Sequence, residues 1–256
     1  MITVNDIEKA LFGWAPLSLA TKGDKVGLQT GERSKSVRRV LVSLDVTQAV
    51  IREAVFTARA DLIVSHHGIL RDETRPTDDT DAGLVLLTLC QTGVASIAMH
   101  TNLDAAKGGV NDVLAERIGL VDVRVFNQEY DIGHIGRLPA PMSVQDFAAQ
   151  CKAAVKTGVV RYYDAGKTVQ TVALCSGGGG FLLEDAIKAG CDTFVTGDVK
   201  HSQFLTAQNQ GVNLLCCGHF ATENVVVPVV AAFLQKRFPD LEVLLSGETS
   251  EPFQCL

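Results

Sequence analysis

The chain has 256 residues, of which 46% are hydrophobic and 20% are charged, and its formal net charge is −6. This composition excludes a disordered chain and allows one large globular domain or two of ordinary size. The acidic balance and the lack of a Lys/Arg run argue against a general nucleic-acid-binding protein.

The amino terminus, Met1 to Trp14, has a helix-like pattern and lacks the basic start and apolar block of a signal peptide. No apolar stretch reaches the about 18 residues that cross a bilayer. The seven cysteines follow no metal-binding spacing, and we expect buried thiols in a reducing cytoplasm, with a single thiolate ligand from Cys216 or Cys217 as the alternative. These cysteines are Cys90, Cys151, Cys175, Cys191, Cys216, Cys217 and Cys255.

The first half of the chain predicts strands that alternate with helices. Residues 39–44 are apolar and β-branched, as in a strand, and residues 46–59 have helical spacing with Thr47 as N-cap. A second strand over residues 61–65 ends at His66-His67. A third, over residues 96–99, leads to His100 and Asp104 and then to a helix over residues 110–118.

The middle segment, residues 121–167, predicts strand pieces at 123–126 and 132–138. Pro139 and Pro141 indicate a turn, and Ser143 indicates the N-cap of a helix that extends to about residue 155. The segment is too short for a further domain, so we assign it to the start of a second lobe.

The second half repeats the order of the first. The pattern predicts a strand over residues 168–175, a helix over 181–189 closed by Gly190, and a strand over 191–196. A strand over residues 213–217 then leads to His219 and Glu223, and a helix follows over residues 224–237. We therefore predict an α/β protein made of two related lobes from an internal duplication, residues 1–122 and 123–256.

Both halves place a histidine and a carboxylate four residues apart just after a strand. In open α/β sheets, ligands gather outside the carboxyl ends of the strands. Histidine nitrogens and carboxylate oxygens suit Zn, Mn, Fe, Co or Ni, and a His and an acid on one helical turn can meet one ion. The predicted metal ligands of a site with two divalent ions are His66, His67, His100, Asp104, His219 and Glu223.

Adjacent His66 and His67 point different ways if the chain is extended there, so they would reach different ions or one would orient the other. The alternative is that the histidines are hydrogen-bonded structural residues and that Asp104 and Glu223 only stabilise helix N-termini. His134 and His201 lack a second matching ligand, so His134 is interpreted as structural and neither is counted among the ligands; an approach of His201 to the site from the second lobe is the alternative.

Ser176 and the four glycines after it follow a strand and precede a helix. Successive backbone N–H groups in such a loop can cradle a phosphate. The run lacks the Walker lysine and the dinucleotide spacing. A tight turn or close lobe packing is the alternative.

These motifs resemble the GTP cyclohydrolase I type 2 homologues, also called Nif-three-like proteins, over nearly the whole chain. The segments that carry the resemblance are Asp24-Lys-Val-Gly27-Leu28, Leu44-Asp45-Val-Thr47, Ser65-His66-His67, His100-Thr-Asn-Leu-Asp104, Thr196-Gly197-Asp198 and Gly218-His219-Phe-Ala-Thr222-Glu223. The resemblance implies a dinuclear metal site between two lobes, with His66, His67, Asp104, His219 and Glu223 as ligands and His100 close by. It also implies a hexameric ring, a trimer of dimers, and the short middle segment indicates that the domain inserted in some members is absent.

Three positions depart from the family pattern. Gly68 stands where the family usually has proline, Lys25 where it often has asparagine, and only His201 remains of a second double histidine. These departures bear on substrate contacts rather than on the matched ligands.

The resemblance implies a metal-dependent hydrolase that acts on GTP or another nucleotide, with ring opening and formate release, and with Glu223 and Asp104 bridging or steering the metals. The alternative is a non-catalytic metal-binding interaction or regulatory protein. A ring that encircles nucleic acid is a third reading, which the acidic charge disfavours.

Overall fold

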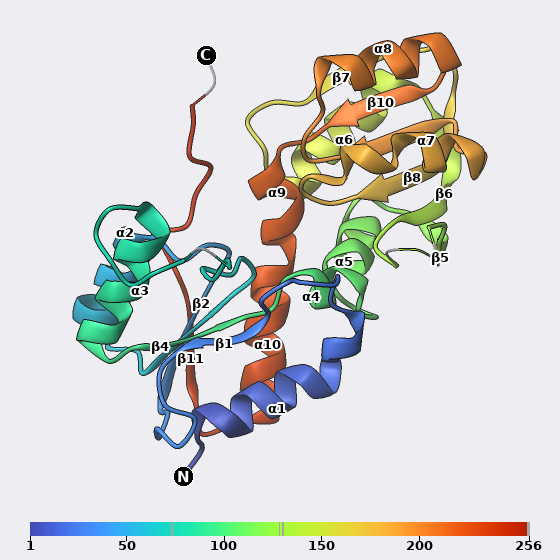
Figure 1. Ribbon diagram of the computed structural model, residues 1–256. Coiled ribbons are helices and arrows are strands. Elements are labelled where there is room, and N and C mark those ends of the chain that lie inside the picture. The colour runs from blue at the N-terminus through green and yellow to red at the C-terminus, as the bar shows by residue number, and fades with distance from the viewer. Residues whose placement is uncertain (73, 128, 130, 255–256) are drawn as a thin grey trace. The chain divides into compact units, whose positions relative to one another are not determined.

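The computed structural model describes residues 1–72, 74–127, 129 and 131–254, so that Cys255 lies outside the described residues. The chain divides into two compact units, residues 1–106 with 227–250, and residues 107–226 with 251–256. Each unit contains a β-sheet and helices (Figure 1). Within the described ranges, the helices are too short or too polar to cross a bilayer.

The sheet of the first unit has the strand order β1-β4-β3-β2-β11. Its strands are β1 (Gly27–Thr30), β2 (Arg39–Ser43), β3 (Leu62–Ser65), β4 (Ala95–Ala98) and β11 (Glu242–Leu245). Its helices are α1 (Val4–Trp14), η1 (Leu17–Leu19), α2 (Gln48–Arg52), the π-helix η2 (Glu53–Thr57), α3 (Asp81–Thr92), α4 (Thr101–Ala105) and α10 (Val227–Arg237).

The sheet of the second unit has the strand order β5-β6-β8-β9-β10-β7. Its strands are β5 (Val121–Val125), β6 (His134–Met142), β7 (Arg161–Tyr163), β8 (Val169–Cys175), β9 (Thr193–Thr196) and β10 (Asn213–Cys216). Its helices are α5 (Val110–Arg117), α6 (Val144–Val155), η3 (Gly179–Leu182), α7 (Leu183–Lys188), α8 (His201–Gln210), α9 (His219–Glu223) and η4 (Asn224–Val226).

The prediction of two related α/β lobes is confirmed by the strand pairing. In the first unit β2, β3 and β4 are parallel, and β1 is antiparallel on the outer side of β4. In the second unit β8, β9 and β10 are parallel, and β7 is antiparallel on the outer side of β10. The four strands β1, β4, β3 and β2 therefore correspond to β7, β10, β9 and β8. Beyond β2 the first sheet adds β11, and beyond β8 the second sheet adds β6 and β5.

Each sheet is covered on both faces, which explains why the central strands are apolar throughout rather than alternating. The β3 strand is buried at every position, and Ile63 packs with Leu41 against the Val50 and Leu89 side chains of α2 and α3. On the opposite side, the rings of Trp14 and Phe233 lie 4.8 Å apart and join α1 to α10. Burial of each such side chain contributes about 1.5–3 kcal/mol.

In the second unit, α7 and α8 pack on the side of the sheet to which Phe194 points. Phe194 and Phe147 are both fully buried. Five of the cysteines are buried as predicted, and Cys90 is exposed. Burial, helped by the neighbouring Asp192 carboxylate, raises the pKa of the Cys191 thiol to about 12, so this thiol is an inert core group.

Three caps follow the predicted chemistry. Thr47 and Ser143 begin their helices with side chains that accept hydrogen bonds from the backbone N–H groups of Val50 and Asp146. Gly190 follows α7 with φ of +87°, a conformation that glycine adopts without strain.

The structure differs from the sequence prediction at the two prolines. The β6 strand runs through Pro139 and Pro141, although its pairing with β8 is irregular between Arg137 and Met142. Proline has no N–H to give to a ladder, so it is tolerated where the pairing is interrupted.

The division of the chain also differs from the predicted boundary after residue 122. Residues 107–122 belong to the second unit, and residues 227–250 belong to the first. The reason is that β11 pairs with β2, in the register of Leu244 with Leu41, so the last helix and strand return to the first sheet.

Candidate metal centre

The strand register brings the predicted ligands of the first unit to one edge of its sheet. Ser43, Ser65 and Ala98 lie side by side as the last residues of β2, β3 and β4. The residues that follow them, among them His66, therefore leave the sheet at the same edge.

Three histidines gather at this edge. The rings of His66 and His67 have centroids 5.0 Å apart, and His100 lies 5.3 Å from His66 and 5.6 Å from His67. Each offers one ring nitrogen, and these nitrogens all lie within 4.8 Å of one another. The chain bends at residues 66 and 67 rather than continuing extended, so the adjacent rings share one site instead of pointing apart.

The other ring nitrogen of each histidine is held by an oxygen. His66 Nδ1 lies 2.8 Å from the Met99 carbonyl, His67 Nδ1 lies 2.7 Å from Asp45 Oδ1, and His100 Nδ1 lies 2.9 Å from Asp24 Oδ2. An oxygen that accepts a hydrogen bond from Nδ1–H fixes the ring and its tautomer and makes Nε2 the nitrogen that meets a metal. These three contacts have the pattern of metal-ligand support.

Asp104 joins the group through His66 rather than through His100. Its Oδ1 lies 3.7 Å from His66 Nε2, and both side chains are almost fully buried. One ion with ligand distances of about 2.0–2.2 Å can bind two donors at this separation. Asp104 lies within the short helix α4, whereas His100 precedes that helix with non-helical backbone angles.

The second unit forms the His-x3-acid pair as predicted. His219 and Glu223 are the first and last residues of α9, and His219 Nε2 lies 3.1 Å from Glu223 Oε2. His219 Nδ1 lies 2.6 Å from Asp198 Oδ2. Here too a carboxylate supports Nδ1 and directs Nε2 toward a second donor.

The two carboxylates raise the pKa of His219 to about 9. The hydrogen bond with Glu223 is the main cause, burial opposes it, and Asp198 adds a smaller effect. A divalent cation between His219 and Glu223 would replace this proton as the positive partner of the carboxylate.

The glycine run after β8 packs against this pair. Gly177 has φ of +54°, and a Cβ there would overlap the Glu223 carboxylate. The N–H groups of Ser176, Gly177 and Gly179 are bonded to Asn111 Oδ1, Thr222 Oγ1 and the Ser176 carbonyl. The glycines therefore allow the loop to pack closely against Glu223. These three N–H groups donate hydrogen bonds within the protein, so they are not directed at a phosphate.

Both groups fit divalent metal ions by the chemistry of their donors. Imidazole nitrogens and carboxylate oxygens suit Zn, Mn, Fe, Co or Ni, and each of the four imidazoles is oriented by an outer hydrogen bond. Among the described residues, His66, His67 and His100 already form a group with metal-ligand spacing in the first unit.

Comparison with known proteins identifies the family of this chain. The profile of the family described as Duf34/NIF3 (NGG1p interacting factor 3) matches residues 2–252. The chain belongs to the Duf34/NIF3 family.

Curated relatives match the chain over its full length. A GTP cyclohydrolase 1 type 2 homolog of Clostridium perfringens is 32% identical over 261 residues, which cover 99% of each protein. A Streptomyces coelicolor protein of the same name is 33% identical and covers 99% of the chain and 94% of the relative.

Solved structures share the Duf34/NIF3 fold. The Bacillus cereus protein related to NIF3 superposes with a TM-score of 0.92 at 23% identity and covers 100% of this chain and 99% of that one. A Staphylococcus aureus protein superposes with a TM-score of 0.88 at 26% identity and covers 100% and 99%.

Other predicted residues of this Duf34/NIF3 chain lie outside the two groups. His134 Nε2 lies 3.0 Å from Asp112 Oδ1, a contact that joins β6 to α5. His201 is exposed at the start of α8. The Cys216 thiol donates to the Gly197 carbonyl at 3.0 Å.

Sequence reasoning gave no role to the carboxylates that orient the histidines, Asp24, Asp45 and Asp198. Asp45 and Asp198 each follow the carboxyl end of a parallel strand, where ligands gather in open α/β sheets. These two carboxylates could therefore have been found from the same strand-end position as the histidines. Asp24 precedes β1, and it reaches His100 because β1 is antiparallel to β4, with Gly27 opposite Ala98. That pairing has no local sequence signal.

Two of the three positions that depart from the family pattern, Lys25 and Gly68, lie in the first unit. Lys25 Nζ forms an exposed ion pair with Asp72 at 2.8 Å. A Cβ at Gly68 would lie 3.2 Å from Gln29 Oε1 and 3.4 Å from the Ala98 Cβ, so the turn after the double histidine is tightly packed.

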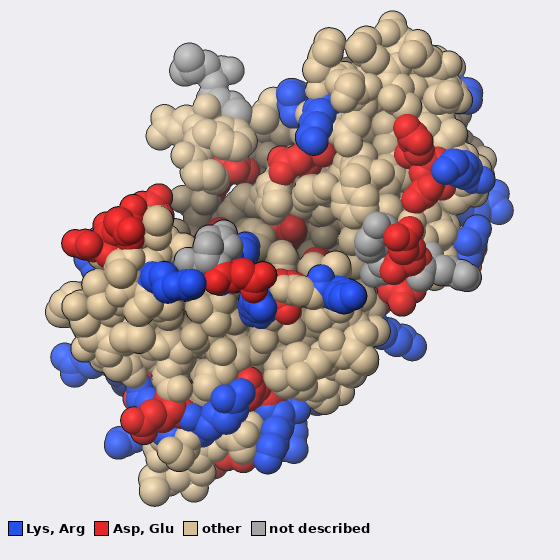
Figure 2. All heavy atoms as spheres, in the orientation of Figure 1, with Lys and Arg blue, Asp and Glu red and all other residues tan. Residues whose placement is uncertain are grey.

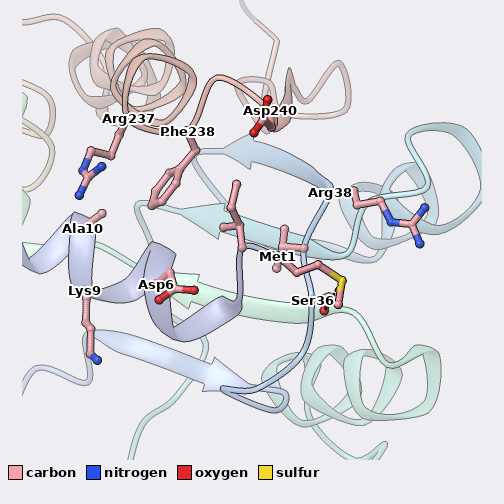
Figure 3. Close-up of a pocket in the computed structure, with 11 residues that line it drawn as sticks. Met1, Asp6, Lys9, Ala10, Ser36, Arg38, Arg237, Phe238 and Asp240 are labelled. Atoms are coloured by element: carbon pink, nitrogen blue, oxygen red, sulfur yellow. Dashed lines mark hydrogen bonds between the residues drawn. The ribbon is translucent and has the colours of Figure 1, made fainter.

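A cavity of about 790 Å³ lies elsewhere in the first unit, between the start of α1 and the end of α10 (Figure 3). Its lining includes Lys9, Arg38 and Arg237 but no histidine, and Lys9 and Arg38 extend in different directions. Its lining residues therefore offer no imidazole to a metal ion, and its cations do not converge on one point. Basic and acidic side chains are interspersed over the face in Figure 2, which does not favour a long polyanion.

Proposed function

We propose that this protein is a divalent-metal-dependent hydrolase that takes two metal ions per chain. The ligands are His66, His67, His100 and Asp104 of the first unit and His219 and Glu223 of the second. The observation that carries the proposal is that carboxylates hold Nδ1 of His67, His100 and His219 at 2.6–2.9 Å. Structural histidines have no need of this shared orientation, whereas metal ligands do.

Bound divalent ions lower the pKa of a coordinated water and polarise a carbonyl or phosphoryl oxygen. The contribution of this chain is to supply neutral imidazoles and ionised carboxylates in fixed orientations. Asp104 and Glu223 are buried carboxylates beside histidines, and we assign them the bridging or steering of the metals. Asp24, Asp45 and Asp198 keep the imidazoles in the ligand tautomer.

We propose GTP or another nucleotide as the substrate to be tested first. The support is the name of the relatives, GTP cyclohydrolase 1 type 2 homolog, whose similarity spans the whole chain. The reaction expected from that name is ring opening of the purine with release of formate. Formate and the opened product are measured after incubation of the metal-loaded protein with GTP.

A second candidate is a non-catalytic metal-binding protein that acts through a partner. The family description, NGG1p interacting factor 3, names an interaction rather than a reaction and favours this alternative. Catalytic metal sites keep a position open for water, whereas structural sites are closed. Water exchange at a bound Mn²⁺, measured by proton relaxation, therefore separates the two candidates.

Metal content tests the proposal most directly. We expect about two metals per chain by plasma mass spectrometry after incubation with Mn, Fe, Co or Zn, and a loss in the double variant His219→Ala/Glu223→Ala. The matched control is His201→Ala, since His201 is an exposed histidine outside both groups and should keep the wild-type content. A protein without metal under all four conditions would end the hydrolase proposal.

The hexameric ring stays a prediction that rests on the family resemblance, and the cytoplasmic location stays a prediction that rests on the amino-terminal pattern and the cysteines. Sedimentation velocity tests the first of these. A particle with the mass of six chains of 27.3 kDa is expected.

A further inference from the structure

A cavity of about 430 Å³ opens beside His67 within the first unit. Its lining includes Asp45, His67, Ile69, Arg71, Asp81 and Leu84. Pockets for small molecules have this size and combine apolar walls with a few polar groups. The cavity shares His67 and its hydrogen-bond partner Asp45 with the candidate metal centre.

The walls of the cavity are held in place by side-chain hydrogen bonds. The buried Gln29 side chain accepts from the backbone N–H groups of Ile69 and Leu70, both at 3.0 Å, and donates to the Lys25 and Gly27 carbonyls. Gln48 Nε2 donates to Thr88 Oγ1 at 3.2 Å and so joins α2 to α3. The cavity is therefore preformed, which lowers the entropic cost of binding a ligand.

One wall is apolar. Ile69 and Val85 are buried beneath it, and Leu84 remains 37% exposed on α3. An exposed leucine inside a cavity gains free energy when an apolar group covers it. The ligand should therefore carry an aliphatic or similar apolar portion.

The charged groups around the cavity are of both signs. Asp45 and Asp81 are carboxylates and Arg71 is the cation. Asp45 is bonded to His67, so Asp81, exposed in the first turn of α3, is the carboxylate available to an ammonium group. Arg71 donates through Nη1 to the Gly68 and Leu70 carbonyls, at 3.3 and 2.9 Å, and this anchoring leaves its remaining donors for an anionic group.

We propose that this cavity binds a small zwitterion of the α-amino-acid type with an apolar side chain. Its ammonium group would meet Asp81, its carboxylate Arg71, and its side chain the Ile69–Leu84 wall. A ligand with only a negative charge would be repelled by two carboxylates and attracted by one guanidinium. A ligand with only a positive charge would form no contact with Arg71. The inference goes beyond the proposed function, because binding here requires no metal.

Three molecules of similar shape test the charge pattern on metal-free protein by calorimetry. L-leucine carries both charges, 3-methylbutylamine only the positive one, and 4-methylpentanoate only the negative one. Each charge-assisted contact should tighten binding about tenfold, so leucine should bind more tightly than either of the others. Arg71→Gln should reduce leucine binding to the level of the amine and leave amine binding unchanged, and Asp81→Asn should reduce it to the level of the acid.

Arg75→Gln is the matched control. Arg75 is exposed, and its Nη1 also donates to two loop carbonyls, those of Asp72 and Thr74, but it does not line the cavity. This variant should bind leucine as the wild type does. Equal effects of the two arginine substitutions, equal affinities for the three molecules, or no saturable leucine binding would each overturn the proposal.

The outcome is separable from that of the metal experiment. Leucine binding to a chain that takes up no metal would support the cavity and reject the hydrolase. Metal uptake without leucine binding would reject the cavity and leave the hydrolase standing.

Discussion

Gly177 packs directly against the Glu223 carboxylate, at a point where a Cβ atom would overlap the side chain and would also lie 3.2 Å from His219 Nε2. The Gly177 N–H donates to Thr222 Oγ1 at 3.0 Å, and its carbonyl accepts from the Asp198 N–H at 2.8 Å. One glycine thus contacts the helix that carries Glu223 and the loop that carries Asp198. The absence of a side chain at residue 177 is what allows the carboxylate to lie where it does.

Gly177→Ala should therefore damage the second metal group. The new methyl group forces Glu223 to move, and φ of +54° costs a non-glycine residue about 1–2 kcal/mol. We expect metal affinity to fall at least about tenfold, as for a lost supporting contact. Metal titration and thermal unfolding of the variant measure the two effects.

Gly178→Ala is the control for this substitution. Gly178 has φ of −74°, and an added Cβ would meet nothing within 4 Å. Metal affinity should stay at the wild-type value, and stability should stay equal or rise by about 0.4–1 kcal/mol. If the two variants have the same metal affinity and the same stability, the Gly177–Glu223 contact does not contribute to metal binding.

Metal binding should release a proton from His219. Its pKa is raised to about 9, chiefly by the hydrogen bond with Glu223, so the metal-free imidazole is protonated at pH 7. Only neutral imidazole binds a metal, so affinity at this group should fall about tenfold for each pH unit below 9. Calorimetry at pH 7 in buffers of different ionisation enthalpy counts the protons, and His219→Ala should release about one fewer.

Asp24→Asn should weaken the first metal group without touching a ligand. The Asp24 carboxylate accepts from His100 Nδ1 and from the Thr101 backbone N–H, and the asparagine amide cannot replace it as a charged partner. Loss of such an outer contact typically lowers metal affinity about 10- to 100-fold. Asp72→Asn, which breaks only the exposed pair with Lys25, should leave metal affinity unchanged in the same titration.

The same carboxylate should make stability depend on pH in the acid range. Burial raises the pKa of Asp24, but hydrogen bonds from His100 and Thr101 outweigh burial and lower the pKa well below the ordinary value of 3.8. Its contribution is thus fully present above about pH 4 and is lost as pH falls below that. Urea unfolding between pH 6 and pH 3 should show a smaller decline for Asp24→Asn than for the wild type.

Gln29→Leu should destabilise the first unit. The Ile69 and Leu70 N–H groups would lose their acceptor, and an unsatisfied buried group costs about 1–3 kcal/mol. Gln91→Leu, at an exposed position of α3, should change the free energy of unfolding by no more than about 0.5 kcal/mol. If urea unfolding shows that Gln29→Leu lowers the free energy of unfolding by less than about 0.5 kcal/mol, the role assigned to Gln29 is contradicted.

The two-lobed α/β fold was readable from local pattern because the strands are short apolar runs that end at polar residues. The His219–Glu223 pair was readable for a similar reason, since residues four apart share one face of a helical turn. The prolines of β6 misled the prediction, because an irregular pairing tolerates them only in the context of the neighbouring strand.

The sequence by itself determined that imidazole and carboxylate donors follow the ends of strands, and from them it predicted the candidate metal ligands. Only the tertiary structure decided which oxygen orients each ring and where the chain divides. Asp24 and His100 are 76 residues apart in sequence and meet through the antiparallel pairing of β1 with β4. Likewise, α10 and β11 return to the first sheet because β11 pairs with β2. Contacts of this kind depend on strand order, which is set by the packing of the whole sheet and leaves no periodic trace in the residues themselves.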